Sequence, residues 1–244
     1  GAGLIVTTSG ASAACTGSDG VYTCSGTITT TNDGKDLKAN PLKVTISEEG
    51  TTVDTLNPPA TGEGNAFELT GNAGITFEDK TTGATITGAN NGIQAINSVS
   101  GGISITTTGT TTGEDTDGID ARNFGTGALS ITTTGTTTGG DNGIFAYNAG
   151  TSLTINAAET EGGNYGIYAI NQGKGALSIT TTGTTTGGRH GIYAKNSGTG
   201  ALSITTTGTT TGTSRDGIFA NNSSADASLT INAATTTGGV NGIN

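Results

Sequence analysis

Apolar and polar positions alternate in a phrase that recurs at a nearly constant interval along the second half of the chain. Successive copies begin 26, 25, 23, 25, 26 and 25 residues apart, and a seventh copy starts at Gly242-Ile243-Asn244. The phrase is Gly-Ile-x-Ala-x-Asn, and its six full copies begin at Gly92, Gly118, Gly143, Gly166, Gly191 and Gly217. A unit of this length cannot bury its own apolar face and is stabilised by stacking on its neighbours. The pattern therefore predicts a solenoid, whose function would lie on a surface.

Each repeat predicts three short strands. The phrase is followed ten to twelve residues later by Leu/Ile-Ser/Thr-Ile-Thr/Asn, as at 129–132, and then by a Thr-rich stretch such as 136–139. Thr and Ile favour strands, and the frequent Gly disfavours helices. We predict an all-β fold, a single-stranded right-handed parallel β-helix with three short strands per rung of about 25 residues. Roughly nine rungs at about 4.8 Å each would give a rod about 40–45 Å long.

The first quarter of the chain does not follow this period. Residues 1–60 contain short alternating runs, such as 42–46, separated by turn residues such as Asn32-Asp33-Gly34. We predict that 1–60 form an N-terminal β cap, which would cover the strand edges of the first rung. Residues 61–244 are predicted to form the β-helix rungs, which become regular from about residue 92.

Parity within the phrase predicts which side chains face inward. Ile, Ala and Asn share one parity, whereas the variable positions include the charged Asp120, Arg122 and Lys195. Because a charge cannot lie unpaired in a narrow core, the variable positions are predicted to face outward. By the same alternation Leu177 and Ile179 of the second strand face inward. The inward Asn residues are predicted to stack as a hydrogen-bonded structural ladder formed by Asn97, Asn123, Asn148, Asn171, Asn196 and Asn222.

The outward positions of the phrase become aromatic midway along the repeats. An aromatic side chain covers about 150–250 Å² when buried, so a row of them approaches the size of functional patches on monomers. The alternative is a cross-strand stack that only stiffens the sheet. We predict an exposed binding surface, called the aromatic face below, formed by Phe145, Tyr147, Tyr168, Ile170, Tyr193, Lys195 and Phe219.

Net charge and hydropathy exclude several classes of partner. The chain of 244 residues has a formal net charge of -10, and its nine Lys and Arg are scattered. Nucleic acid and anionic lipid are therefore not expected as partners. The sequence contains no run of 18 apolar residues and no recognisable signal peptide, and from its start at Gly1 we expect an N-terminus that was either processed or chosen for expression.

The two cysteines, Cys15 and Cys24, lie nine positions apart in a segment rich in Gly, Ser and Thr. We predict that they form a disulfide that closes a small loop, with two free thiols as the alternative. A zinc site would lack ligands, because the only histidine is His190, and no metal site is predicted. A disulfide would place the protein outside the reducing cytoplasm.

No motif in this sequence indicates a set of catalytic residues. His190 lies in the stretch 187–191, where we predict a solvated turn, and no Gly-x-Ser-x-Gly motif is present. The acidic stretch 114–117 is predicted to be a solvated turn rather than a calcium site. We therefore expect a protein that is not an enzyme, with no catalytic residue and no cofactor.

The order of several motifs resembles that of autotransporter (type V secretion) passenger domains of the non-protease type. These motifs are the Cys pair, the stretch 64–69, Asn90-Asn91-Gly92-Ile93 and the repeated Gly-Ile-Tyr-Ala rungs. The resemblance implies a Gram-negative protein that is secreted or displayed on the cell surface, after export through the periplasm and the outer membrane by its own C-terminal barrel. That barrel is missing here, and the chain ends within a rung at Asn244, so we expect a passenger fragment.

The resemblance, together with the aromatic face, favours an adhesin or virulence factor. Its expected partner is a host cell-surface protein or glycan, or another bacterium through self-association. A secreted receptor-stimulating effector of growth-factor type is one alternative. Ice binding through outward pairs such as Ser130/Thr132 is a second, although Asn156 and Asn232 interrupt that array. A carbohydrate-active β-helix enzyme is a third, although no groove of Asp, Arg and Lys is evident.

Overall fold

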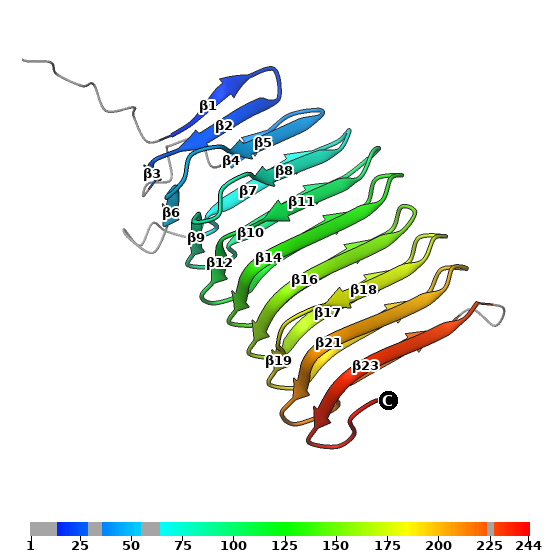
Figure 1. Cartoon of the computed structure of the whole chain (residues 1–244). Coiled ribbons are helices and arrows are strands. Elements are labelled where there is room, and N and C mark those ends of the chain that lie inside the picture. Colours follow the sequence, from blue (N-terminus) through cyan, green and yellow to red (C-terminus); the bar gives the residue numbers. More distant parts are fainter. Residues whose placement is uncertain (1–13, 29–35, 55–63, 224–226) are drawn as a thin grey trace, which may run out of the picture.

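The described residues form a stack of parallel β-strands that contains no helix. The computed structural model describes residues 14–28, 36–54, 64–223 and 227–244. The strands wind into a β-solenoid of about eight turns, close to the roughly nine predicted, and run as a rod from one end of the chain to the other (Figure 1). The predicted all-β parallel solenoid with rungs of about 25 residues is confirmed. Within these segments no helix is long and apolar enough to cross a membrane.

The recurring phrase forms one face of the rod, an eight-stranded parallel sheet that we call the phrase sheet. Each phrase pairs in register with the same phrase of the next rung, so that Ile93 lies beside Ile119 and Asn97 beside Asn123. Its strands are β4 (Asp36–Lys38), β7 (Phe67–Gly71), β10 (Ile93–Asn97), β13 (Asp117–Asn123), β15 (Asn142–Asn148), β17 (Tyr165–Asn171), β20 (His190–Asn196) and β22 (Ile218–Asn222).

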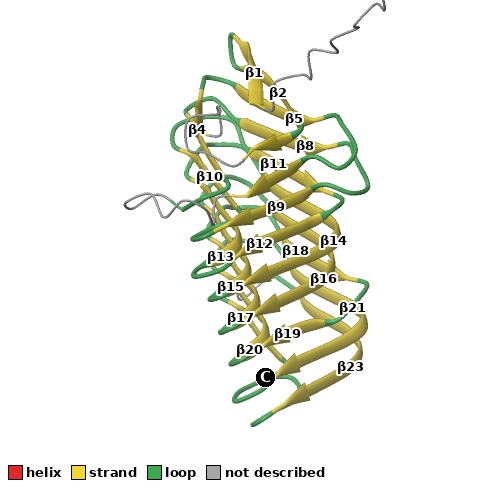
Figure 2. Ribbon diagram, turned by 90° about the vertical axis from the view of Figure 1, so that its left-hand side faces the viewer, coloured by secondary structure: helices red, strands yellow, loops and turns green. Residues whose placement is uncertain are grey.

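The second and third strands of the rungs belong to one 15-stranded sheet, which we call the hydroxyl sheet. In four rungs these two predicted strands are continuous, as β14 (Leu129–Gly139), β16 (Leu153–Gly162), β21 (Leu202–Gly212) and β23 (Leu229–Gly238). Elsewhere they are separate, as β5 (Leu42–Ile46), β6 (Thr52–Asp54), β8 (Ile75–Asp79), β9 (Thr85–Gly88), β11 (Ile103–Thr107), β12 (Thr110–Gly113), β18 (Leu177–Thr181) and β19 (Thr185–Gly187). Figure 2 shows the two sheets on different sides of the rod.

The N-terminal end carries the only antiparallel pair among the described strands. β1 (Ala14–Ser18) and β2 (Val21–Ser25) form a hairpin, which the predicted Cys15–Cys24 disulfide closes. β2 then pairs in parallel with β5, and the two-residue β3 (Thr27–Ile28) pairs with β6. The strands within 36–54 stack in register on the following rung, so the solenoid already includes part of the segment 1–60 for which a cap was predicted.

The core consists of the inward side chains of both sheets. Ile119, Ala121, Leu129 and Ile131 are fully buried, and each large aliphatic residue of this kind contributes about 1.5–3 kcal/mol on burial. The phrase begins with Gly because the backbone of the next rung approaches it closely. A Cβ at Gly118 would lie 2.6 Å from the carbonyl oxygen of the glycine that starts the next phrase.

Six inward Asn side chains form one continuous ladder along the rod. Five amide–amide hydrogen bonds of 2.8–3.2 Å join consecutive rungs. The Nδ2 of each of the first five donates to the Oδ1 of the next, and most of the six also donate to a turn carbonyl, as Asn123 does to Gly127 at 2.9 Å. The members, in order, are Asn97, Asn123, Asn148, Asn171, Asn196 and Asn222. Buried amides are thereby satisfied without water, which fixes the register of the phrase sheet.

Candidate interaction surface

A row of aromatic rings follows the outer side of the phrase sheet over four consecutive rungs. Phe145, Tyr168, Tyr193 and Phe219 occupy the same position of β15, β17, β20 and β22. Their neighbouring ring centroids lie 5.4, 4.9 and 4.7 Å apart, in two edge-to-face contacts and one stacked contact. All four side chains are partly exposed. The result is a continuous apolar strip that solvent still reaches.

A second row lies two residues further along the same strands. Tyr147 and Ile170 are partly exposed and Lys195 is exposed, so the seven predicted residues of the aromatic face share one side of the rod. The Tyr147 hydroxyl donates to Gln172 Oε1 at 2.7 Å, and its ring centroid lies 5.4 Å from that of Phe124. Phe124 is 50% exposed and extends the surface. The sequence pattern missed it because it follows the phrase instead of lying within it.

Asp120 lies next to the aromatic face, at its N-terminal end. It occupies an outward position between Gln94 and Phe145, as parity predicts, but its side chain is buried there. Arg122 Nε donates to Asp120 Oδ1 at 2.8 Å, Gln94 Nε2 donates to Oδ2 at 3.2 Å, and the guanidinium lies 5.0 Å from the Phe145 ring centroid. A side chain can therefore face outward in register and still be covered by its neighbours.

A second polar ladder, which the sequence analysis did not predict, lies at the position before the phrase glycine. We call it the turn ladder. Asn91 Oδ1 accepts from the Asp117 backbone N–H at 3.1 Å, and Asp117 Oδ1 accepts from the Asn142 backbone N–H at 3.1 Å and from its Nδ2 at 2.7 Å. The prediction of a solvated acidic turn at 114–117 is wrong for Asp117, which is buried.

The environment of Asp117 raises the pKa of its carboxyl group. Burial raises the pKa of Asp117 from 3.8 to about 6, because the charged form loses hydration. The side-chain hydrogen bond from Asn142 lowers the pKa and so opposes this shift, while the neighbouring carboxylates of Asp120 and Asp141 raise it further. Asp117 is therefore partly protonated in mildly acidic solution.

The turn ladder is interrupted in two adjacent rungs, beside the aromatic face. Tyr165 and His190 stand where the other five Gly-Ile phrases are preceded by Asn or Asp. The buried Oδ1 of Asn142 consequently has no hydrogen-bond partner. The Tyr165 ring instead stacks on Tyr168 at 4.7 Å and on His190 at 5.6 Å. The departure from Asn or Asp is visible in the sequence and could have located this feature.

His190 was predicted to be a solvated turn residue, and that prediction is wrong. It begins β20, is buried, and has ring centroids 5.7 Å from Tyr193 and 5.8 Å from Phe219. Burial lowers the pKa of His190; Asp216 opposes this shift, while Arg189 and Arg215 add to it. The imidazole is therefore neutral at pH 7, and its Nδ1 accepts from the Asp216 backbone N–H at 3.4 Å.

No nucleophile completes a catalytic arrangement around His190. Within the described segments no serine, threonine or cysteine side chain hydrogen-bonds to its ring. The Asp216 Oδ2 lies 3.4 Å from Nδ1, and the Asp216 Oδ1 accepts from Asn241 Nδ2 at 2.7 Å. In the same segments no group of three or more His, Cys, Asp or Glu could hold a metal ion.

Two arginines lie next to the interruption of the turn ladder, one directly before His190 and one directly before Asp216 of the following rung. Arg189 and Arg215 occupy equivalent turns of adjacent rungs, joined by a 3.1 Å hydrogen bond from the Arg215 N–H to the Arg189 carbonyl. Both side chains are exposed, and the Arg189 guanidinium lies 5.6 Å from the Tyr165 ring centroid. The ion pairs found among the described residues include neither of them. The aromatic face therefore has a cationic border.

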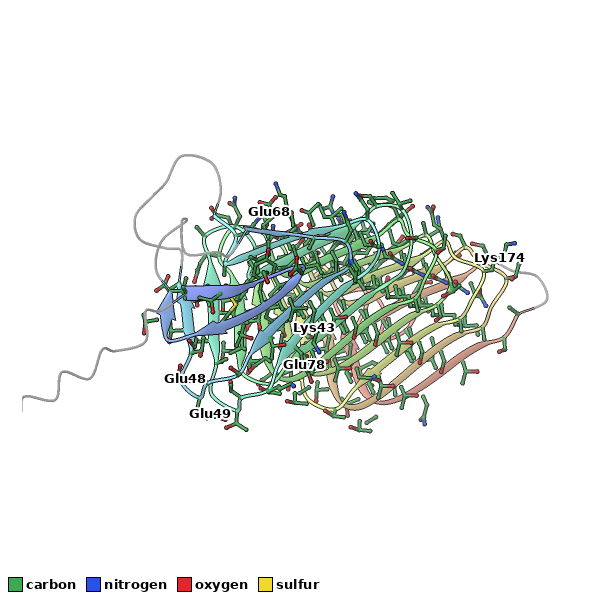
Figure 3. All side chains as sticks on the ribbon, turned by 90° about the horizontal axis from the view of Figure 1, so that it is seen from above. Lys43, Glu48, Glu49, Glu68, Glu78 and Lys174 are labelled. Carbon is green, nitrogen blue, oxygen red and sulfur yellow. A yellow bond between two sulfur atoms is a disulfide. The ribbon has the colours of Figure 1, made fainter. Side chains whose placement is uncertain are left out.

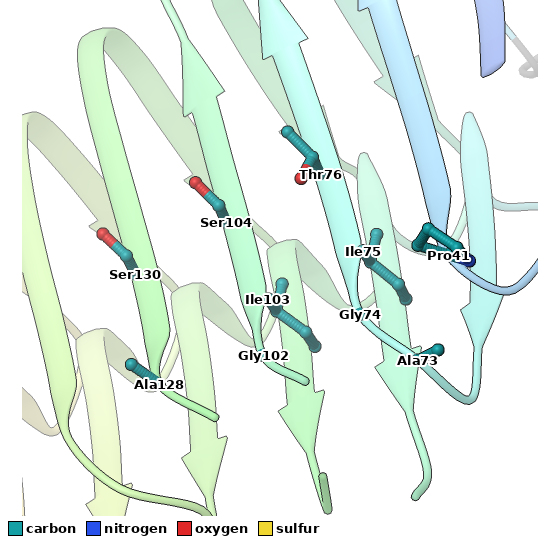
Figure 4. A pocket seen from close by; sticks show the side chains of 10 residues that line it. All are labelled: Pro41, Ala73, Gly74, Ile75, Thr76, Gly102, Ile103, Ser104, Ala128 and Ser130. Atoms are coloured by element: carbon teal, nitrogen blue, oxygen red, sulfur yellow. The ribbon is translucent and has the colours of Figure 1, made fainter. Parts of the chain in front are cut away.

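Hollows elsewhere on the rod offer less chemistry. One of about 370 Å³ lies at the starts of β8, β11 and β14 and contains no titratable side chain (Figure 4); its outward polar groups are Thr76, Ser104 and Ser130. Another, of about 240 Å³, surrounds Ala158, where β16 is one residue shorter than β14. Neither brings an acid and a base together.

The fold defines a parallel β-solenoid repeat protein, and its most distinctive surface is the aromatic face with the cationic border. No family model, no curated protein and no solved structure matches the chain. The function is therefore argued from the surface itself.

Proposed function

We propose that this chain is the passenger region of a secreted or surface-displayed bacterial protein of the autotransporter type, and that it binds a partner on host cells or on neighbouring bacteria through the aromatic face. The proposal draws on the partly exposed rings of four consecutive rungs, which the regular spacing of the rod presents in one line. Partly exposed aromatic side chains are enriched in interfaces because they bury a large area with little loss of conformational freedom.

The observation that favours this function over mere stiffening of the sheet is the interrupted turn ladder. Tyr165 brings its ring beside Tyr168 but leaves the buried Asn142 Oδ1 without a partner, which costs about 1–3 kcal/mol. A residue that served stability alone would be Asn or Asp, as in the neighbouring rungs. Local rules of stability are typically broken at functional sites.

We further propose that the chain is not an enzyme. The buried His190–Asp216 pair faces aromatic rings rather than a nucleophile. The hollow at the starts of β8, β11 and β14 (Figure 4) is lined by hydroxyl and apolar groups. General acid–base work needs a titratable group within hydrogen-bond reach of a substrate proton. A binding role requires only the exposed surface.

Replacement of three rings tests the proposed function. A variant with Phe145→Ser, Tyr168→Ser and Tyr193→Ser should lose at least about tenfold in binding to epithelial cells or to bacteria that display the wild-type chain, because buried aromatic anchors dominate interface energies. Binding is measured with the fluorescently labelled full chain. Circular dichroism and thermal unfolding establish that the solenoid, whose core these outward residues do not enter, remains folded.

The matched control is a triple substitution on the hydroxyl sheet, Ser130→Ala, Ser178→Ala and Ser203→Ala, which lies in similar strands on a different side of the rod. We expect the control to bind as the wild type does. Equal binding by the ring variant and the wild type, with both folded, would exclude the aromatic face as the contact surface.

Ice binding is a second candidate that one observation favours. The outward hydroxyls of the hydroxyl sheet align in two in-register columns, one of which runs through Ser130, Thr154 and Ser178 without interruption. The other is interrupted at Asn156, beside the hollow at Ala158. Thermal hysteresis of the purified chain measures this function directly, and its absence would eliminate it.

A further inference from the structure

Charge is distributed unevenly along the rod. Residues 64–164 contain ten acidic residues and two cations, a net charge of -8, whereas residues 165–223 contain four cations and one acid, a net charge of +3. In Figure 3, Glu48, Glu49, Glu68 and Glu78 lie in the N-terminal part together with a single labelled cation, Lys43, and Lys174 lies toward the other end. A chain with a net charge of -10 therefore has a locally cationic region at 165–223, where most of the aromatic face lies.

Three of these cations lie at the aromatic face: Lys195 belongs to it, and Arg189 and Arg215 lie beside it; we call the three together the basic border. Lys195 lies on β20 between Ile170 and Asn221 and is exposed. None of the three takes part in an ion pair among the described residues. Their charges are therefore available to an external anion.

The two arginines stand in equivalent turns of adjacent rungs, and both side chains are exposed. The one acid of this region does not compensate them, because the Asp216 carboxylate is buried and accepts a hydrogen bond from Asn241 at 2.7 Å. The Arg189 guanidinium lies instead over the Tyr165 ring. The positive charge of the two arginines is therefore not neutralised by any ion pair among the described residues.

We propose that the basic border and the rings beside it bind an acidic oligosaccharide. Its carboxylate or sulfate groups pair with Arg189, Lys195 and Arg215, and the apolar faces of its sugar rings pack on Tyr193 and Phe219. Planar guanidinium groups suit bidentate pairing with such oxyanions. Arg189 and Arg215, and likewise Tyr193 and Phe219, lie one rung apart, about 4.8 Å, whereas Lys195 lies at the other end of β20 from Arg189.

A peptide fits this surface less well. Recognition of an extended peptide by strand addition needs unpaired backbone at a sheet edge. Here β17 and β20 are paired on both sides, by β15, β20 and β22, so only side chains are available. Nucleic acid fits less well because a long polyphosphate would also meet the acidic rungs before residue 165. A short acidic glycan contacts only the cationic region.

This inference rests on the proposed function and is tested with soluble probes. The probes are a heparin-derived octasaccharide with sulfate and carboxylate groups, an oligogalacturonate of similar length with carboxylates only, and a neutral cello-oligosaccharide. Titration calorimetry with the full chain should detect the acidic sugars but not the neutral one, and added salt should weaken the binding. Binding of both acidic sugars indicates carboxylate recognition, and binding of the octasaccharide alone indicates that sulfate is required.

A variant with Arg189→Ser, Lys195→Ser and Arg215→Ser should bind the acidic sugar at least about tenfold more weakly, because three charge contacts are removed together. The matched control is Lys38→Ser, Lys43→Ser and Lys80→Ser, which removes the same charge from the N-terminal rungs and should bind normally. Thermal unfolding verifies that both variants are folded.

The inference is overturned if neither acidic sugar binds, if the basic-border variant binds as well as the wild type, or if oligo-dT or poly-glutamate binds more tightly than either sugar. Cell binding that depends on the aromatic rings while no sugar binds would retain the proposed function and reject the glycan. Sugar binding that depends on the basic border while the ring variant still binds cells would support the glycan site and reject the aromatic face as the cell contact.

Discussion

At the residue scale, Asp117 shows how one position of a repeat acquires its own chemistry. It is the acidic member of the turn ladder between Asn91 and Asn142, and its pKa is raised to about 6 by burial. Since Asn occupies the adjacent rungs, Asp117→Asn should keep the acceptor for Asn142 and remove a buried charge. We expect the free energy of unfolding at pH 7.5 to rise by as much as about 3 kcal/mol, from a shift of roughly two pKa units.

The sign of the pH dependence follows from the proton count. Between about pH 4 and pH 6 the folded state holds more protons at Asp117 than the unfolded state, so the wild type loses stability as pH rises through this window. The difference between Asp117→Asn and the wild type, measured by urea unfolding, should be small at pH 3.5 and largest above pH 7. A constant difference across this range would contradict the raised pKa.

Single residues were also where prediction from the sequence failed. Parity correctly gives the side of the sheet on which a residue lies, but it does not say what covers that side. Asp120 faces outward yet is covered by Arg122 of its own strand and Gln94 of the preceding rung, and His190 is covered by Tyr165 of the preceding rung and Tyr193 of its own strand. The contacts that cross rungs join residues 25 or 26 positions apart and depend on the exact stacking of the rungs.

At the element scale, the glycine that begins each phrase fixes how closely the rungs stack. A Cβ at Gly118 would approach Thr137 Cγ2 to 2.7 Å as well as the backbone of the next rung. We expect Gly118→Ala to lower the free energy of unfolding by about 1–3 kcal/mol through overpacking. Urea denaturation measures the change.

Gly83→Ala is the matched control, because a Cβ there would approach no atom closer than 3.6 Å and the backbone is not in a left-handed conformation. Its stability should stay within about 1 kcal/mol of the wild type, with any gain arising from reduced freedom of the unfolded chain. Equal effects of the two substitutions would show that close stacking at the phrase glycine does not matter.

The repeating elements were predictable because period and parity act together. The phrase strands, their inward Ile and Ala, and the parallel solenoid all follow from the sequence. The continuous strands β14, β16, β21 and β23 could not be predicted from the sequence, because a Thr-rich stretch reads the same whether the strand continues through it or breaks there. The first rung within 36–54 lacks the phrase and so gave no periodic signal.

At the scale of the whole molecule, the solenoid converts a sequence repeat into long surfaces with different chemistry. One side carries in-register hydroxyls, and the other carries the aromatic face, whose C-terminal part is cationic in an otherwise acidic chain. A rigid rod holds these groups in place before any partner arrives, which reduces the entropy lost on binding. The side that contacts the partner therefore defines the function.

Hydroxyl-radical footprinting of the chain bound to cells tests that claim most directly, because it compares aromatic and long aliphatic side chains on different sides of the rod in one experiment. We predict that Tyr147, Tyr168, Tyr193 and Phe219 become protected on binding, while Tyr22 at the N-terminal hairpin and Lys43 on the hydroxyl sheet keep the reactivity of the free chain. Protection of the hydroxyl sheet, with unchanged reactivity of the rings, would contradict the proposal that the aromatic face is the binding surface.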